Sequence, residues 1–173
     1  MLPGFPETVE GEILFCNADN ISTDGIYPGK YTYQDDVINE KMAEVVMQNY
    51  DPQFTSIAQR NDILVGGRNF GCGSSREQAT TVILVKKLPL VIAGSLGNTF
   101  SRNAVNNALP LLEVPHLVQR LREVFSSTQI ESSQQNMREP SQKRESLDSP
   151  PSGAQAVPYK EQVLTRRTSW TLR

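Results

Sequence analysis

The stretch DILVGGRNFGCGSSREQATTVILVKKLPLVIAG, residues 62–94, decides the fold class. It begins with a short apolar run, Asp62–Gly67, and ends with a second one, Leu88–Gly94. Between the two runs, apolar groups recur at the i, i+3, i+4, i+7 spacing of one helix face: Ala79, Val82, Ile83 and the stem of Lys86. A strand, a glycine-rich loop, a helix and a second strand form a βαβ unit with parallel strands. The sequence therefore predicts an α/β fold.

Similar patterns extend to both sides of this unit. Before it, residues 10–15 predict a strand, and residues 36–50 place apolar side chains at roughly helical spacing. After it, residues 101–109 predict a short helix and residues 110–115 a strand bounded by prolines. Partial alternation of apolar and polar residues over 163–172 predicts one more strand.

The composition of the chain changes sharply near Ser126. Residues 126–158 hold eight Ser, five Gln, four Pro and no aromatic residue. Such a stretch buries too little apolar surface to offset the entropy lost on ordering, so we expect a disordered Ser/Gln/Pro-rich segment. The expected organisation is a domain at 1–125, a low-complexity insertion at 126–158 and a truncated remnant of the domain at 159–173.

Charge and apolar content exclude several classes of function. The formal net charge of the 173 residues is −2, which provides no basic field for a nucleic-acid partner. No apolar run approaches the roughly 18 residues that cross a membrane, and no signal segment opens the chain. The two cysteines make neither a disulfide framework nor a metal site, so we expect an intracellular soluble protein.

The glycine-rich loop follows a strand, at the end of a parallel sheet where ligands bind. Ser74 and Glu77 have the spacing of a capping box, which predicts a helix start at Ser74 and unpaired N–H groups that attract an anion. Gly71 and Gly73 would let the backbone approach a ligand, and Arg76 could grip a carboxylate or phosphate with two hydrogen bonds. Glycines and a cap can also serve only to turn the chain. On these features alone, the two interpretations stand about even.

Familiar motifs do not match this loop. It has neither the Walker A spacing nor the third glycine of a dinucleotide fingerprint, and the G-x-S-x-G elbow is absent. A nucleophilic Cys72 would need a histidine base, and the only histidine, His116, follows a different strand. We expect His116 at the surface or at a strand end, and Cys72 to be a small packed residue.

Three stretches, in order, resemble the small, swivelling β/β/α domain of the aconitase superfamily. They are GGRNFGCGSSREQA at 66–79, NADNISTDGIYPGKYTYQDD at 17–36 with its T-D-x-I-x-P motif, and AGSLGNTFSRNAVNNALPLLEVP at 93–115. The third departs from the family pattern at Leu96 and Thr99. Within the superfamily the chain is most similar to the C-terminal domain of single-chain fungal homoaconitases. Isopropylmalate dehydratase small subunits, which share the first stretch, are the nearest alternative.

The resemblance implies a hydro-lyase that removes water from a tricarboxylate and adds it back. Ser74 would be the base that removes a proton beside a carboxylate, with Ser75 supporting it and Arg76 binding a substrate carboxylate. Asp24 would match the buried aspartate of the family's active site. Serine is a weak base, so its alkoxide would need main-chain N–H groups at the helix start and the Arg76 cation.

The resemblance places substrate selection in the loop after Pro28, at Lys30, Tyr31 and Thr32. These residues would face the variable end of the substrate, which favours homocitrate and homoaconitate in lysine biosynthesis. Relatives often carry an arginine nearby where this sequence has Lys30. A solvated loop charge is an equally good interpretation of Lys30.

Enzymes of this family dehydrate their substrates with a [4Fe–4S] cluster, which three thiolates hold. This chain has two cysteines, so the resemblance implies that a cluster-bearing large subunit or set of domains provides the cofactor. We expect a detached or truncated swivel domain that is inactive alone and, from the fungal resemblance, mitochondrial. Two alternatives remain open, a carboxylate-binding module without chemistry and a defective product that retains only an interaction fold.

Overall fold

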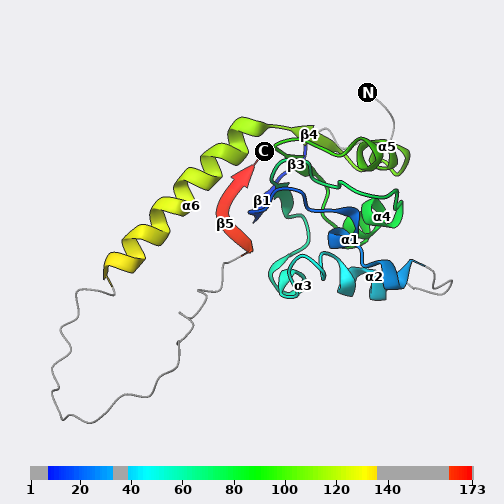
Figure 1. Ribbon diagram of the computed structural model, residues 1–173, viewed down its shortest axis with the longest axis horizontal. Helices are drawn as coiled ribbons and strands as arrows, with labels where there is room; N and C mark the ends of the chain where they lie inside the picture. Colours follow the sequence, from blue (N-terminus) through cyan, green and yellow to red (C-terminus); the bar gives the residue numbers. More distant parts are fainter. Residues whose placement is uncertain (1–7, 33–38, 136–163, 173) are drawn as a thin grey trace, which may run out of the picture.

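A computed structural model describes residues 8–32, 39–135 and 164–172 of the chain. Its centre is a five-stranded sheet in the order β4-β3-β2-β1-β5, flanked by helices on both faces (Figure 1). The strands are β1 Gly11–Cys16, β2 Ile63–Gly66, β3 Val91–Ala93, β4 Leu111–Glu113 and β5 Thr165–Leu172. The helices are α1 Thr23–Ile26, α2 Asn39–Val45, α3 Phe54–Ile57, α4 Gln78–Val85, α5 Asn98–Asn106 and α6 Pro115–Gln135, with a 3-10 turn η1 at Gly29–Tyr31. The predicted α/β class is confirmed.

The βαβ unit predicted from residues 62–94 is present. Strands β1 to β4 run parallel, with Leu64 of β2 opposite Val91 of β3, and α4 connects these two strands. The strand predicted at 163–172 is also present, and it pairs antiparallel with β1 at the sheet edge. The residues after the insertion therefore complete the same sheet as the residues before it.

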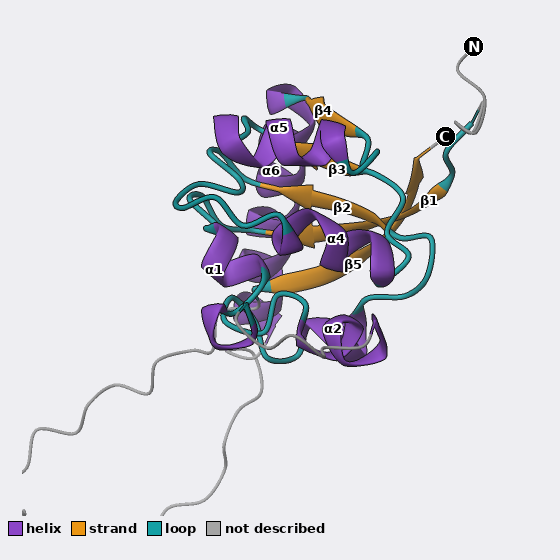
Figure 2. Cartoon of the chain, turned by 90° about the vertical axis from the view of Figure 1, so that its right-hand side faces the viewer, coloured by secondary structure: helices purple, strands orange, loops and turns teal. Residues whose placement is uncertain are grey.

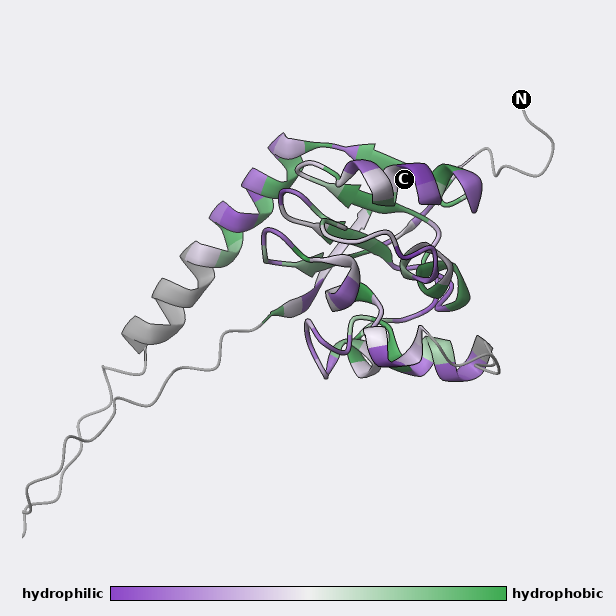
Figure 3. Ribbon diagram, turned by 45° about the vertical axis from the view of Figure 1, so that its right-hand side comes forward, coloured by the Kyte–Doolittle hydropathy of each residue, from purple (hydrophilic) through white to green (hydrophobic). Residues whose placement is uncertain are grey.

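Alternation along the strands creates two separate apolar layers. On β1, Leu14 and Cys16 face a core that the helices from α1 to α5 cover. Their neighbours Ile13 and Phe15 face the other core, which α6 closes with Val118 and Leu121. Figure 3 shows the inner strands of the sheet as strongly hydrophobic, as expected for β2 and β3, which are buried on both faces.

Helix α6 differs from the prediction for the low-complexity segment. We expected disorder from residue 126, but α6 continues to Gln135, so the change in composition does not coincide with the helix end. A helix that is already formed by its packed first turns adds each further residue at little cost, and Ser and Gln are tolerated there. The rest of the predicted insertion, 136–158, lies outside the described residues. So do 1–7, 33–38, 159–163 and 173.

Strand β5 is fixed to the body of the domain by polar contacts as well as by the ladder. Arg167 forms ion pairs with Glu12 of β1, at 2.5 Å, and with the buried carboxylate of Asp62, at 3.0 Å. The Tyr50 hydroxyl donates a hydrogen bond to the carbonyl oxygen of Leu164 at 2.5 Å. These contacts join β5 to three separate segments. Among the described residues, no helix is both long and apolar enough to cross a membrane.

Candidate functional site

The stretches that carry the family resemblance meet at the carboxyl end of β1 and β2. Figure 2 shows the loops there gathered beside α1 at one end of the sheet. The loop after β2 lies along the segment that leads into α1: Gly71 N–H donates to Ile21 O at 2.7 Å, and Thr23 N–H donates to Cys72 O at 2.8 Å. Two of the motifs that carry the family resemblance are therefore in direct contact.

A buried threonine holds the backbone of the serine pair. The Thr23 hydroxyl donates a hydrogen bond to Ser74 O at 2.8 Å, and Thr23 is only 1% exposed. The side chains of Ser74 and Ser75 lie on the exposed outer side of this bend. Within the described part of the chain, the backbone N–H groups from Gly73 to Glu77 donate to no other residue. The bend thus combines two accessible hydroxyls with a run of available donors.

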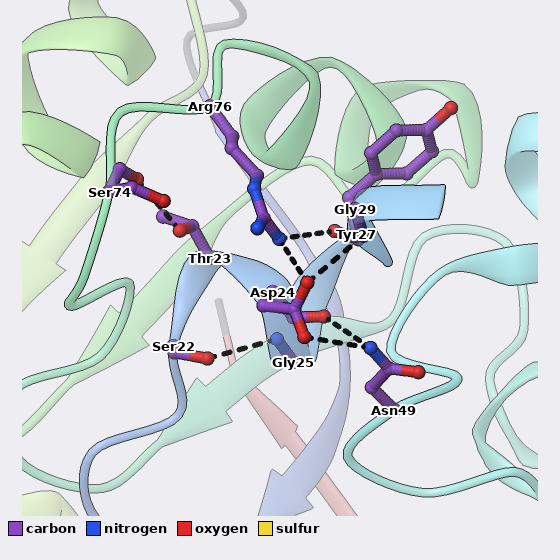
Figure 4. A network of polar contacts seen from close by, with 9 residues as sticks. All are labelled: Ser22, Thr23, Asp24, Gly25, Tyr27, Gly29, Asn49, Ser74 and Arg76. Atoms are coloured by element: carbon purple, nitrogen blue, oxygen red, sulfur yellow. Dashed lines mark hydrogen bonds and ion pairs between the residues drawn. The ribbon is translucent and has the colours of Figure 1, made fainter. Parts of the chain in front are cut away.

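Asp24 and Arg76 form the charged centre of the site (Figure 4). Arg76 Nη1 makes an ion pair with Asp24 Oδ1 and donates to Tyr27 O at 3.2 Å. The same carboxylate oxygen accepts the Gly29 N–H at 2.9 Å. The second oxygen, Oδ2, accepts the Asn49 side-chain amide at 2.9 Å. The Asp24 carboxylate therefore has donors on both oxygens.

These donors hold the pKa of Asp24 below its ordinary value. The hydrogen bond from Arg76 is the main cause, followed by the Gly29 N–H. The resemblance implied a buried aspartate, but half of the Asp24 side chain is exposed, against 20% for Arg76. The described residues alone leave Asp24 half exposed, and its match to the family's aspartate stays a prediction. With donors on both oxygens, the ionised Asp24 serves as an acceptor that orients its neighbours, and it is a poor proton acceptor.

The predicted capping box at Ser74 and Glu77 is wrong. Helix α4 begins at Gln78, and its N-cap residue Glu77 makes no side-chain capping bond. The first turn is instead closed by Ala79 N–H to Arg76 O at 3.2 Å and Thr80 N–H to Glu77 O at 3.0 Å. Contacts with α1 hold the preceding residues in a bend, and tertiary contacts override the local capping signal. Ser74 therefore lies before the helix, not at its start.

The two glycines of the loop have different roles. Gly71 has φ +75°, and a Cβ built there would lie 2.3 Å from Cγ of the buried Phe100 ring. This glycine allows close packing of the loop against α5, so its predicted role in approaching a ligand is wrong. Gly73 has φ +96° with no atom closer than 3.7 Å to such a Cβ. Of these two glycines, only Gly73 leaves its backbone open to a ligand.

The predicted specificity residues follow the Asp24 segment. Lys30 is exposed, with Nζ 4.9 Å from the centre of the Tyr31 ring, and both belong to η1. The Tyr27 hydroxyl donates to Tyr31 O at 3.4 Å and so links η1 to the end of α1. Thr32 Oγ1 is buried, and no described residue is its hydrogen-bond partner. Residues 33–38, which come next, are not described.

Sequence reasoning missed three polar contacts of the site. Thr23 and Tyr27 lie inside the T-D-x-I-x-P motif, where only Asp24 was assigned a role. Asn49 lies in the turn after α2, a segment that was read only as a helix. Its distance along the chain from Asp24 gives no sequence signal, because the contact depends on how α2 packs against α1.

The remaining candidates lie apart from this centre. Cys16 is fully buried, and burial raises the pKa of its thiol. Cys72 is only partly buried, and its thiol donates a weak hydrogen bond to Asn20 O at 3.4 Å. His116 is exposed in the first turn of α6, as predicted. Among the described residues no three His, Cys, Asp or Glu side chains group as metal ligands.

Comparison with known proteins identifies the family. The aconitase C-terminal domain family matches residues 2–117, about two thirds of the chain. The chain belongs to this family. The structure supports the assignment, because the matched region contains β1 to β4 and both halves of the Ser74–Asp24 site.

Two fungal relatives of this aconitase-family domain carry the same name. Over 127 residues, 73% of the chain, it is 74% identical to "Homoaconitase, mitochondrial" of Aspergillus fumigatus. Over 170 residues, 98% of the chain, it is 58% identical to the protein of that name from Aspergillus oryzae. These alignments cover 16% and 18% of the two relatives, so the chain spans less than a fifth of their length.

A solved structure matches the fold of this aconitase-family domain. The 3-isopropylmalate dehydratase of Methanocaldococcus jannaschii superimposes with a TM-score of 0.55 at 36% identity, over 60% of each chain. The predicted swivel-domain fold, the family and the similarity to fungal homoaconitases are thus confirmed. The roles of individual site residues are not tested by these comparisons.

Proposed function

We propose that this chain is the swivel-domain part of a mitochondrial homoaconitase, a hydro-lyase that interconverts homocitrate and homoaconitate in lysine biosynthesis. High identity to proteins with that name supports the proposal. Because the chain spans less than a fifth of those proteins, it would act together with cluster-bearing domains or a large subunit. Alone, it would be inactive.

One observation carries the proposal: a bend with two exposed serines lies against the ion pair of Asp24 and Arg76. The Thr23 hydroxyl fixes the bend through Ser74 O, and the chain reverses so that Arg76 extends toward Asp24 (Figure 4). A domain that served only as a structural unit would gain nothing from exposing two hydroxyls beside available N–H donors and a guanidinium.

In this proposal Ser74 Oγ accepts the proton next to a substrate carboxylate. The available N–H groups from Gly73 to Glu77 would stabilise the alkoxide, a role for which we expected helix-start amides. The Ser75 hydroxyl would support the Ser74 alkoxide together with these N–H groups. Arg76 would bind a carboxylate of the substrate, because its hydrogen bonds to described residues leave only from Nη1.

The substrate's distal end would reach η1. Lys30 there is placed over Tyr31, and Thr32 carries a buried hydroxyl without a described partner. Together with Tyr31, these two residues would distinguish homocitrate from shorter hydroxy acids.

Enzymes of the aconitase family use a [4Fe–4S] cluster, and the residues of this chain do not fit one. A cluster of this kind needs three thiolates. The chain has two cysteines, of which Cys16 is buried in the apolar core. The cofactor would therefore be bound by the cluster-bearing partner.

Two further functions are supported by specific observations. The structural match to a 3-isopropylmalate dehydratase favours that enzyme's small-subunit role as the second candidate. The exposed Ser74 bend and Arg76 also suit a carboxylate-binding module that carries out no reaction.

The test is reconstitution of the chain with the cluster-bearing domains of a fungal homoaconitase. We expect hydration of homoaconitate, and Ser74→Ala should lower kcat by about 100-fold or more, in the range of lost acid–base catalysis. Ser56→Ala, at an exposed serine of α3 outside the site, is the control and should keep full activity. Turnover of isopropylmalate alone would favour the second candidate, and binding without turnover would favour the module.

A further inference from the structure

Asn49 contacts the active-site aspartate twice. Its side-chain nitrogen Nδ2 donates to Asp24 Oδ2 at 2.9 Å and to the backbone oxygen of Asp24 at 3.1 Å. The same amide group thus holds both the side chain and the main chain of one residue. Figure 4 shows Asn49 approaching Asp24 from the side opposite Arg76.

The turn that carries Asn49 is fixed against α1. Met47 has a positive φ of 58°, which ends α2 and reverses the chain. Its N–H donates to Ile26 O, the last residue of α1, at 2.7 Å, and Met47 itself is fully buried. Because turn and helix are joined by this bond, the position of Asn49 relative to Asp24 is set by the fold and not by a mobile loop.

The contacts of Asp24 are divided between its two oxygens. Oδ1 accepts Arg76 and the Gly29 N–H, and Oδ2 accepts Asn49. Without Asn49, Oδ2 would lose its donor in the described part of the chain, and the half-exposed carboxylate could rotate about its terminal torsion. Such rotation would move Oδ1, which is the anchor of the Arg76 guanidinium.

We propose that Asn49 is a positioning residue that locks the Asp24 carboxylate and, through it, holds Arg76 ready for the substrate carboxylate. The inference rests on the proposed role of Arg76. It assigns a function to a residue outside the three stretches that resemble the family. A hydrogen-bond donor is needed at this position, because it faces a carboxylate that is ionised, and the Asn49 amide provides one.

The test compares Asn49→Asp and Asn49→Ala in the full chain. Aspartate has the shape of asparagine but places a second carboxylate against Oδ2, which should raise the pKa of Asp24. Alanine removes the donor and should raise that pKa less. The pKa of Asp24 in each variant is measured by NMR titration of the Asp24 carboxyl carbon. Asn106→Asp, at an exposed residue of α5, adds the same charge elsewhere and should leave the pKa of Asp24 unchanged.

Kinetics of the reconstituted enzyme give the second measurement. We expect Asn49→Asp to raise KM for homoaconitate about tenfold, the effect of one charge-assisted hydrogen bond, with kcat changed much less. Asn49→Ala should raise KM in the same direction, and Asn106→Asp should not. An unfolding curve of each variant shows that the fold is intact.

The outcomes separate the two proposals. If both Asn49 variants leave the pKa of Asp24 and KM at wild-type values, the positioning role is wrong. If the pKa rises while the wild-type assembly shows no hydratase activity, Asn49 does position Asp24 and the proposed function fails. If kcat falls and KM stays constant, Asn49 acts on the chemical step and the proposed route through Arg76 is overturned.

Discussion

Arg76 links the two halves of the site through one nitrogen. Nη1 contacts both Asp24 and Tyr27 O, and within the described residues the other guanidinium nitrogens have no acceptor. A planar fork anchored on one side can present its remaining N–H groups to a carboxylate with little loss of entropy. The geometry explains why an arginine that is already paired remains suitable for binding a ligand.

Arg76→Lys tests this arrangement. An ammonium group can replace the charge but cannot contact Asp24 and a substrate carboxylate with a rigid fork. We expect the affinity for homoaconitate to fall about tenfold, as for loss of one strong hydrogen bond, with unchanged stability. Isothermal titration calorimetry and urea unfolding measure the two quantities. If the variant bound homoaconitate with wild-type affinity, the proposed binding of a substrate carboxylate by Arg76 would be wrong.

The pH dependence of stability tests the pairing of Asp24. Its folded-state pKa is lowered, so the stabilisation is present above the unfolded pKa, about 3.9, and is lost as the pH falls through the lower folded value. Because half of the side chain is exposed, the effect should be less than about 1 kcal/mol. Urea unfolding between pH 6 and pH 2 measures this effect. The free energy of unfolding should fall less steeply with decreasing pH in Asp24→Asn than in the wild type. Equal slopes would show that the ion pair does not contribute.

At the scale of elements, the loop after β2 is held by packing on one side and hydrogen bonds on the other. Gly71 lies against Phe100 of α5, while Thr23 at the start of α1 holds Ser74. The rings of Phe70 in this loop and Phe100 of α5 meet edge to face, with centroids 5.5 Å apart. The exposed bend therefore rests on a rigid apolar base.

Gly71→Ala should disrupt this base. The new Cβ would collide with the Phe100 ring and force a positive φ on alanine, so we expect a loss of about 3 kcal/mol or more in unfolding free energy. Gly73→Ala is the matched control: it shares the positive φ but has no close neighbour, and should cost about 1 kcal/mol. Urea unfolding of both variants measures the difference. Equal losses would mean that backbone strain alone explains the glycine at 71.

The elements that sequence predicted well are those with a strong local pattern. The apolar runs at 62–67 and 88–94 became β2 and β3, because continuous apolar runs suit strands buried on both faces. The start of α4 was misplaced by four residues, since the Ser74–Glu77 pattern competes with contacts to α1 that are distant in sequence.

The same contrast holds for the site. Motif resemblance selected Asp24, Ser74 and Arg76, and the structure brings their segments together. It could not indicate Asn49, whose contact depends on the packing of α2 against α1, nor that Asp24 is half exposed. Exposure and long-range hydrogen bonds are properties of the tertiary structure, and a single sequence carries no pattern for them.

At the scale of the whole molecule, the fluorescence of one residue reports on whether β5 is in place. Trp170, the only tryptophan, lies on β5 with its ring 6.4 Å from that of Phe125 on α6. The edge position of β5 raises the question of whether it separates before the rest unfolds. The ion pairs of Arg167 with Glu12 and Asp62 join β5 to β1 and to the start of β2, which favours one cooperative unit.

Equilibrium unfolding tests this cooperativity. The urea transition followed by Trp170 fluorescence should coincide with that followed by far-ultraviolet circular dichroism. If β5 separated first, fluorescence would change at a lower urea concentration than the helical signal. Trp170→Phe, which keeps an aromatic ring beside Phe125, provides the control for the origin of the fluorescence.

The antiparallel position of β5 beside β1 has a consequence for biosynthesis. A ribosome makes β1 before the other strands of this sheet and β5 after them, so one side of β1 stays without its hydrogen-bond partner throughout the synthesis of residues 17–164. Unpaired strand edges on nascent chains are prone to associate with one another. The need for chaperones during translation should therefore grow with the time that passes before residues 165–172 emerge. Lengthening the segment between α6 and β5 should increase that need.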